Sequence, residues 1–331
     1  MDYNRFMKGI SAIMLVFMLV LSSILITDTN TVSGEPFGSS GVTERTGNGS
    51  HNITLFLHNV SDSEASKTIP GNGSTWNWFD TEAEFNKVNT TLTATGTNNR
   101  FDWYLYPALA DKVTTSSVSL KIWAKAGMGS SQNANIQVEI YERDSTGTEA
   151  IVGSNNVGSQ TFPAVGTLWT WTVNFATPHN FSKGSSIKVR LIANPGTSKT
   201  VYFYYDSLKA NSRVIIPTAD HIMVDDIKTK DSSGEDRLNF DAIADNKTID
   251  IRALIKDPFG GYDIKWVNVS VSYLNGSSII EKVGMKKISG TPISRISQYR
   301  YLLNYSSLPS GKYNITIWAL DNSGYNYCNH F

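Results

Sequence analysis

The sequence predicts an all-β protein in which two β-sandwiches follow one apolar N-terminal helix. From residue 52 onward, apolar and polar residues alternate with a period of two in short segments, as in strands that bury one face. No segment after residue 26 keeps the 3.6-residue period of an amphipathic helix. Pro217 and Thr218 interrupt the alternating segments. We therefore expect one sandwich over residues 51–217 and a second over residues 218–331.

The first 26 residues form the expected helix. Arg5 and Lys8 precede an uncharged run of 18 residues, Gly9–Ile26, and a helix of that length extends about 27 Å, close to the thickness of a bilayer's hydrocarbon core. Because the basic residues come first, the positive-inside rule places the N-terminus in the cytoplasm and everything after residue 26 outside the cell. An uncleaved single-pass membrane anchor is the main interpretation. A cleaved secretory signal is the alternative, although no small-x-small cleavage pattern follows the run.

The start of this helix supports a third interpretation. Lys8-Gly9-Ile10-Ser11 before a long apolar helix resembles the class III signal of archaeal type IV pilins and archaellins. In that family a dedicated peptidase cuts after the glycine, and the helix packs into a filament core. The resemblance therefore implies a pilin-like filament subunit. Residues 27–50, rich in Ser, Thr and Gly without a hydrophobic period, predict a flexible, solvated stalk.

Strand positions in both sandwiches follow from the alternating apolar residues. We expect about eight strands in the first sandwich. In the second, we expect the strand around Ile251 to pair with the strand around Val269, and a turn at Asp321–Gly324. Because the chain stops at Phe331, either the final strand is short or the chain is part of something longer. The inward-facing residues in the first sandwich are Val118, Leu120, Ile122, Ala124, Ile136, Val138, Ile140, Trp169, Trp171, Val173, Phe175, Ile187, Val189, Leu191, Ala193, Val201, Phe203 and Tyr205, and in the second Ile249, Ile251, Ala253, Ile255, Val267, Val269, Val271, Tyr273, Tyr299, Tyr301, Leu303, Tyr305, Tyr313, Ile315, Ile317 and Ala319.

Local motifs add a resemblance to known modules. Residues 101–110 (FDWYLYPALA), 117–124 and 181–189 resemble the jelly-roll domains of exported hydrolases and archaeal surface proteins. Residues 257–264 (DPFGGYDI) and 311–321 (GKYNITIWALD) are similar to immunoglobulin-like (Ig-like) modules of prokaryotic surface proteins. The resemblances imply a jelly-roll-like sandwich followed by an Ig-like one, at a cell surface of archaeal style. They specify folds and no chemistry.

Composition and motifs argue against several functional classes. Equal numbers of basic and acidic residues, 29 each, with no basic block make nucleic acid a poor partner. The single cysteine, Cys328, excludes an intrachain disulfide and a cysteine-based zinc site, and we read it as a bystander thiol. No P-loop, G-x-S-x-G, G-x-G-x-x-G or H-E-x-x-H motif occurs. We therefore expect a non-catalytic protein without cofactor or metal.

Acidic residues cluster between Asp225 and Asp236, where five carboxylates fall within twelve residues. Calcium sites use several loop oxygens, but this spacing does not match an EF-hand. We therefore read the stretch as a solvated loop. Asp144, Asp257 and Asp321 are expected to cap turns with their side chains.

Eleven Asn-x-Ser/Thr sequons, nearly double the number expected by chance, predict a glycosylated external surface. A composition rich in Asn, Ser and Thr would also generate sequons, so this alternative stays open. The candidate sites are Asn48, Asn52, Asn59, Asn72, Asn89, Asn180, Asn246, Asn268, Asn275, Asn304 and Asn314.

Three tryptophans are candidate ligand-facing residues. Trp123 alternates out of phase with the apolar residues of its strand, and Trp266 and Trp318 share the polar phase of Asn268 and Asn314. Exposed flat aromatic rings bind sugar faces, although tryptophan is mostly buried in proteins. Trp169 and Trp171 are expected in the core.

Together these observations favour a membrane-anchored surface protein with a structural, adhesive or partner-binding role. Its expected partners are the membrane, through residues 9–26, and a cell-envelope protein or glycan. The second hypothesis is a carbohydrate- or ligand-binding module that serves a separate enzyme.

Overall fold

The computed structural model describes residues 50–59, 77–81, 90–207, 209–241 and 247–331. The expected N-terminal helix and nearly all of the expected stalk lie outside these residues. Every regular element in the described ranges is a β-strand, so the all-β prediction is confirmed there. The described part contains no helix that is long and apolar enough to cross a membrane.

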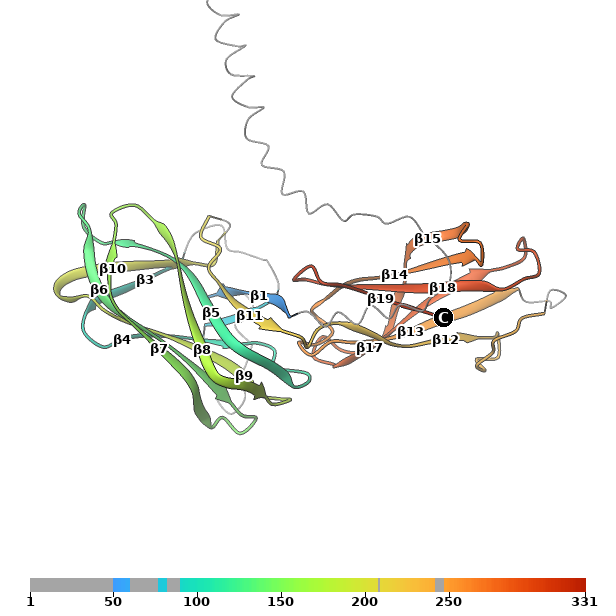
Figure 1. Ribbon diagram of the computed structural model, residues 1–331, viewed down its shortest axis with the longest axis horizontal. Coiled ribbons are helices and arrows are strands. Elements are labelled where there is room, and N and C mark those ends of the chain that lie inside the picture. The colour runs from blue at the N-terminus through green and yellow to red at the C-terminus, as the bar shows by residue number, and fades with distance from the viewer. Residues whose placement is uncertain (1–49, 60–76, 82–89, 208, 242–246) are drawn as a thin grey trace, which may run out of the picture. The chain divides into compact units, whose positions relative to one another are not determined.

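The first sandwich comprises strands β1 to β11, which form one continuous hydrogen-bonded sheet (Figure 1). Along this sheet the order is β3-β10-β5-β11-β1-β2-β4-β9-β6-β7, with β8 paired to β5. All pairings are antiparallel except that of β2 with β4. The strands are β1 (His51–His58), β2 (Trp78–Asp80), β3 (Thr90–Gly96), β4 (Asn99–Leu105), β5 (Val113–Ala126), β6 (Gln132–Arg143), β7 (Glu149–Phe162), β8 (Thr167–Phe181), β9 (Ser186–Asn194), β10 (Gly196–Tyr205) and β11 (Arg213–Thr218).

The predicted inward-facing residues form the core of this sandwich. Leu120, Ile122 and Ala124 of β5 are fully buried, as are Val201 and Phe203 of β10. This burial explains the strict alternation, because successive side chains of a strand point to opposite faces. Trp171 is buried, and Trp169 packs partly against the same core.

The structure has eleven strands here rather than about eight. The additional strands include polar ones. Strand β3 reads TTLTATG and has one buried residue, Ala94. Strand β7 reads EAIVGSNNVGSQTF and has one buried residue, Phe162. Because both lie at an edge of the sheet and bury little surface, the apolar period that marks a strand is weak in them.

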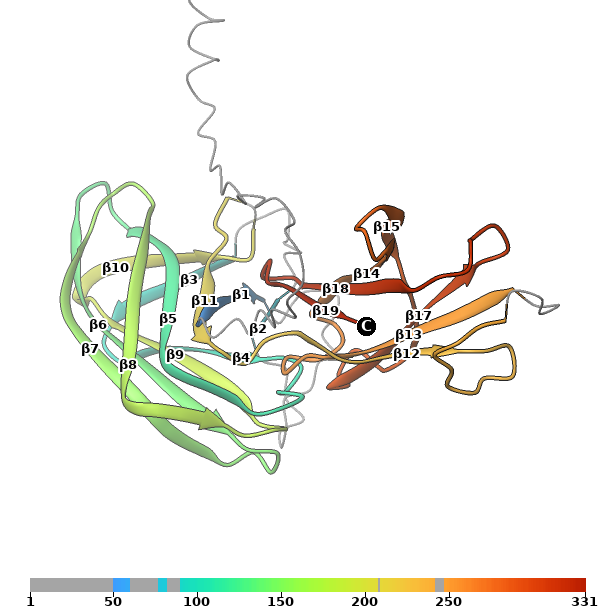
Figure 2. The ribbon, with the colours of Figure 1, turned by 45° about the vertical axis from the view of Figure 1, so that its right-hand side comes forward.

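The second sandwich has two antiparallel sheets that stack as layers in both views (Figures 1 and 2). One sheet has the order β12-β13-β17-β16 and the other β15-β14-β18-β19. A second apolar core lies between them, centred on residues such as Ile251, Val269 and Ile317. The strands are β12 (Met223–Lys230), β13 (Thr248–Lys256), β14 (Ile264–Tyr273), β15 (Ser278–Gly284), β16 (Lys286–Ser289), β17 (Ile296–Asn304), β18 (Tyr313–Asp321) and β19 (Asn326–His330).

The predicted pairing of the strands around Ile251 and Val269 is wrong. These strands are β13 and β14; β13 pairs with β12 and β17, whereas β14 pairs with β15 and β18. The intervening segment, residues 257–263, carries the chain from one sheet to the other. Alternation shows only that each strand buries one face, and two strands that bury faces against each other across a core show the same pattern as two neighbours in one sheet.

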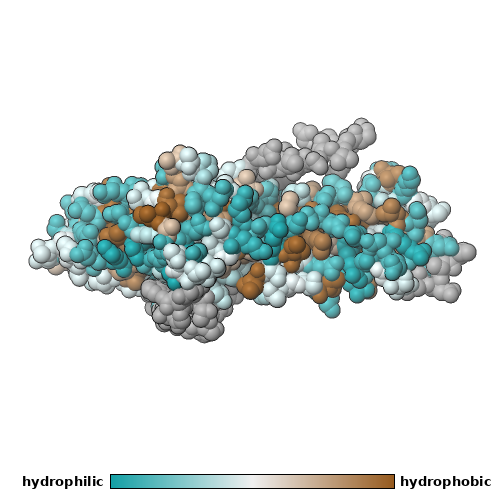
Figure 3. Space-filling view, turned by 90° about the horizontal axis from the view of Figure 1, so that it is seen from below, coloured by the Kyte–Doolittle hydropathy of each residue, from teal (hydrophilic) through white to brown (hydrophobic). Residues whose placement is uncertain are grey.

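The surface of the described residues is mainly polar. On the face shown in Figure 3, hydrophilic residues predominate and hydrophobic ones form separate patches. The final strand, β19, has five residues and follows the turn at Asp321–Gly324.

Candidate functional site

The outer face of β5 and β10 in the first sandwich carries a group of aromatic side chains, which we call the aromatic row: Trp123, Tyr202 and Tyr204. All three are half-buried and point away from the core, because their neighbours Ile122, Ala124, Val201, Phe203 and Tyr205 fill it. Tyr204 lies directly opposite Trp123 in the ladder. The strand register thus places three aromatic rings side by side on one outer surface.

Polar groups accompany these rings. Lys125 lies opposite Tyr202, and its Nζ is 6.0 Å from the Tyr202 ring centroid and 5.6 Å from that of Tyr204. The two tyrosine rings are 6.4 Å apart. On the other side of β10, Thr93 and Thr91 of β3 lie opposite the same two tyrosines. Ring faces thus stand next to hydroxyl and ammonium groups that donate hydrogen bonds.

The sequence predicted the outward position of Trp123 but missed its tyrosine neighbours. The alternation placed Val201, Phe203 and Tyr205 inward, and all three are buried, so Tyr202 and Tyr204 between them face outward. What the sequence did not reveal is that β10 lies beside β5, which brings these tyrosines next to Trp123.

Trp266 and Trp318 also lie on an outer face, that of β14 and β18 in the second sandwich, and both are half-buried. They do not form a comparable row. Trp266 lies opposite Leu320, and Trp318 lies opposite Asn268. Neither tryptophan therefore has an aromatic residue directly opposite it. The Nζ of Lys282 lies 4.9 Å from the Trp318 ring centroid.

The outer face of β4, β9 and β6 carries a network of charged side chains that the sequence did not reveal. Its centre is Lys188, whose side chain is 2% exposed and whose Nζ lies 2.6 Å from Glu149 and 3.1 Å from Asp102. Arg190 binds the same Asp102 through Nε and Nη2 at 2.7 and 2.8 Å. Arg143 pairs with Glu149 at 2.8 Å. Each of these cations is paired with at least one carboxylate. We therefore read the network as one that stabilises the surface of the sheet.

A buried histidine in the first sandwich lies between two carboxylates. His58 Nδ1 is 3.3 Å from Asp206 Oδ1, and Nε2 is 3.2 Å from Asp80 Oδ1. Burial lowers the pKa of His58, but the hydrogen bonds and charges of Asp206 and Asp80 outweigh it and raise the pKa to about 9. The side chain is therefore an imidazolium at neutral pH and donates to both carboxylates.

The second sandwich buries three carboxylates in a different way. Asp257 and Asp321 cap turns as predicted, since their Oδ1 atoms accept hydrogen bonds from Phe259 N and Tyr325 N, both at 2.8 Å. Asp144 caps its turn in the same way. Asp263 Oδ1 accepts from Asn322 N at 3.2 Å. The Oδ2 atoms of Asp257, Asp263 and Asp321 are buried and have no hydrogen-bond partner among the described residues.

Burial raises the pKa of each of these three groups. Desolvation is the main cause, and the neighbouring carboxylates add to it for Asp257 and Asp263. The pKa of Asp257 lies well above its ordinary value, that of Asp263 is about 7 and that of Asp321 about 6. Below these raised pKa values, proton uptake rather than an opposite charge therefore compensates their burial.

The acidic stretch from Asp225 to Asp236 is engaged in surface ion pairs. Asp225 pairs with Lys256, Asp231 with Arg237, and Asp236 with Lys228 and Lys230. Within the described ranges, no group of three or more His, Cys, Asp and Glu side chains is arranged to hold a metal ion.

Seven of the eleven sequon asparagines fall within the described residues. Asn52, Asn180, Asn275, Asn304 and Asn314 are exposed, and Asn59 and Asn268 are half-buried. The others, Asn48, Asn72, Asn89 and Asn246, lie outside the described residues.

No protein-family model matches the chain. Solved structures with some likeness include a CocE/NonD family hydrolase from Staphylococcus aureus, with 9% identity and a TM-score of 0.35 over 52% of this chain and 37% of that one. A Bacteroides uniformis beta-glucuronidase shows 8% identity and a TM-score of 0.24 over 85% of this chain and 32% of that one. The N-terminal CBM22 tandem domain of Paenibacillus barcinonensis Xyn10C shows 12% identity and a TM-score of 0.24 over 70% of this chain and 78% of that one.

The chain spans about a third of the length of the two enzymes. The likeness to all three structures is weak and concerns β-sandwich architecture only.

Proposed function

We propose that the protein is a non-catalytic cell-surface binding protein whose first sandwich holds a carbohydrate ligand on the aromatic row. The main observation in support is that Trp123, Tyr202 and Tyr204 lie side by side on β5 and β10 and face outward. Sugar rings present flat C–H faces that stack on aromatic rings, and hydroxyl rims that accept hydrogen bonds. The row offers both complements, because Lys125 and the tyrosine hydroxyls border the ring faces.

The proposal includes the architecture and location that the sequence favours. The first sandwich is jelly-roll-like and the second Ig-like, and the apolar run at residues 9–26 anchors them outside the cell. Protease treatment of intact cells tests the location. Both sandwiches should be digested in intact cells; protection there, with digestion only after lysis, would contradict it.

Ligand binding is tested on purified full-length protein with a panel of neutral oligosaccharides and polysaccharides, followed by calorimetry on the best ligand. Replacing Trp123 and Tyr204 by alanine should weaken binding at least tenfold, about 1.4 kcal/mol or more. Tyr273→Ala is the matched control, because Tyr273 is a half-buried aromatic residue of the second sandwich.

Three results would overturn the sugar-binding assignment. They are equal affinity in the double variant and the control, loss of binding in both, and an absence of binding to every member of the panel. Thermal unfolding of each variant shows whether a loss of affinity reflects a loss of fold.

A further inference from the structure

The second sandwich carries four cations in one straight row across the outer face of its β12-β13-β17-β16 sheet. We call this row the cation ladder: Lys228, Arg252, Arg300 and Lys286. The strand register places Lys228 opposite Arg252, Arg252 opposite Arg300, and Arg300 opposite Lys286. Each of the four strands thus contributes one cation at the same level.

This arrangement opposes the stability of the sheet. Like charges directly opposite each other on neighbouring strands are destabilising. Asp250 relieves part of the repulsion, because its Oδ2 accepts from Arg252 Nε and Nη2 at 3.0 and 2.9 Å and its Oδ1 accepts from Arg300 Nε at 3.1 Å. One carboxylate is therefore shared between two guanidinium groups.

Lys228 is compensated only by carboxylates at the surface. Lys228 lies 3.6 Å from Asp226 and 3.3 Å from Asp236, and its side chain and theirs are 40–51% exposed. Lys230 lies two residues further along β12 and pairs with the same Asp236, whose Oδ1 is 2.6 Å from Lys230 Nζ. With Lys230 included, five cations meet three carboxylates on this face, so positive charge remains in excess.

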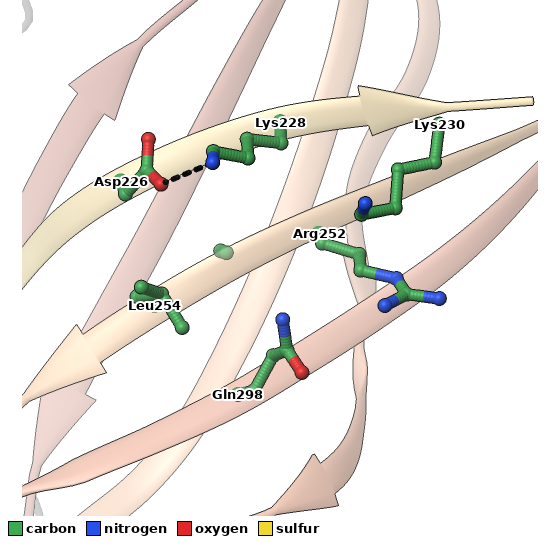
Figure 4. Close-up of a pocket in the computed structure, with 7 residues that line it drawn as sticks. Asp226, Lys228, Lys230, Arg252, Leu254 and Gln298 are labelled. Atoms are coloured by element: carbon green, nitrogen blue, oxygen red, sulfur yellow. Dashed lines mark ion pairs between the residues drawn. The ribbon is translucent and has the colours of Figure 1, made fainter. Parts of the chain in front are cut away.

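The ladder is open to a ligand. Arg300 keeps both Nη groups free of hydrogen-bond acceptors among the described residues, and its side chain is 39% exposed. A shallow pocket of about 270 Å³ lies over the β12 and β13 part of the ladder. Figure 4 shows Lys228, Lys230 and Arg252 on this face of the sheet beside Gln298 of β17, whose amide adds a hydrogen-bonding group.

We propose that the cation ladder binds a linear acidic polysaccharide of the polyuronate class. Neighbouring strands lie about 4.8 Å apart, so the four cations extend over about 14 Å in a line. Such a line suits a chain that carries one carboxylate on each successive sugar. Duplex nucleic acid is the other polyanion that a row of cations attracts, and the test includes it as a competitor. The ladder lies on the second sandwich and is independent of the aromatic row.

The test uses full-length protein with polygalacturonate as the probe, neutral dextran as the uncharged reference, and duplex DNA as the competing polyanion. The exposed ends of the ladder are neutralised in Lys228→Gln/Lys286→Gln, which leaves the Asp250 bridge intact. Lys265→Gln/Lys312→Gln is the matched control, because it removes two exposed lysines outside the ladder.

Polygalacturonate should bind the unchanged protein and the control equally, and the ladder variant should lose about tenfold in affinity. A rise in salt from 50 to 500 mM should also weaken binding, because exposed charges are screened. Arg252→Lys/Arg300→Lys, which keeps the charges, should retain most of the affinity. Trp123→Ala should leave it unchanged, which separates this site from the aromatic row.

Any of four results would overturn the inference: no measurable binding of polygalacturonate to the unchanged protein, equal affinity in the ladder and control variants, equal binding of dextran and polygalacturonate, or stronger binding of DNA than of polygalacturonate. Thermal unfolding of the variants confirms that each remains folded.

Discussion

The two sandwiches compensate buried charge by different means. In the first, each buried cation has carboxylates around it: His58 lies between Asp80 and Asp206, and Lys188 lies between Asp102 and Glu149. In the second, the carboxylates of Asp257, Asp263 and Asp321 are buried with one oxygen each left without a hydrogen-bond partner among the described residues. An imidazole approaches one of these groups: His51 Nε2 is 3.7 Å from Asp321 Oδ2.

His51 does not supply the missing positive charge, because burial lowers its pKa and the neighbouring His221 lowers it further. The difference between the sandwiches therefore has a consequence for stability. The two carboxylates raise the pKa of His58 and favour its charged form, whereas the carboxyl groups of the second set take up protons below their raised pKa values. Stability therefore depends on pH through His58 in the first sandwich and through these carboxyl groups in the second.

The largest expected effect comes from His58→Ala, which removes the cation from between two buried carboxylates. Loss of one partner of a buried ion pair costs about 3–5 kcal/mol of unfolding free energy. Urea denaturation measures it, with His330→Ala, at an exposed histidine, as the control. Because the pKa of His58 is raised to about 9, its contribution is full below pH 6.5 and falls as the pH rises through 9. The alanine variant should lose this pH dependence; equal slopes in both proteins would refute the ion-pair account.

A smaller effect is expected from Asp263→Asn in the second sandwich. A carboxyl group with a raised pKa contributes fully below pH 4, and stability falls as the pH rises toward about 7, by about 1.4 kcal/mol per pH unit for each proton. The asparagine variant removes this group, so its stability should fall less between pH 4 and 7 and should exceed that of the unchanged protein at pH 8. Denaturation at pH 4, 6 and 8 measures it. A steeper fall in the variant would show that Asp263 is ionised and needed as a charge.

The smallest effect is expected from Asp231→Asn, which removes the charge that pairs with the exposed Arg237 side chain. The amide keeps an oxygen that can accept from the backbone N–H groups of Ser233 and Glu235, as Asp231 Oδ1 does. Exposed ion pairs contribute little because water and salt screen them. The midpoint of urea denaturation should not change measurably at any pH between 4 and 9. A clear shift would mean that surface pairs in the stretch from Asp225 to Asp236 stabilise the fold as the buried groups do.

The sequence predicted which side chains of a single strand are buried and which face outward. Alternation identified Leu120, Ile122 and Ala124 as buried, and it placed Trp123 on the opposite face. It could not say which strands are neighbours, so the assigned partner of the strand around Ile251 was wrong. The same limit hid the aromatic row and the cation ladder. Trp123 and Tyr204 are distant in sequence and meet only through the pairing of β5 with β10.

Lys286 of the cation ladder also bears on association between chains. It belongs to β16, a four-residue strand at the end of its sheet, where unpaired backbone groups offer a template to strands of other molecules. A short edge strand that carries adjacent lysines repels such additions. Neutralising Lys286 and its neighbour Lys287 should therefore make concentrated solutions of the protein more prone to form intermolecular sheet, so the crowded cations that strain this surface also help to keep neighbouring copies apart.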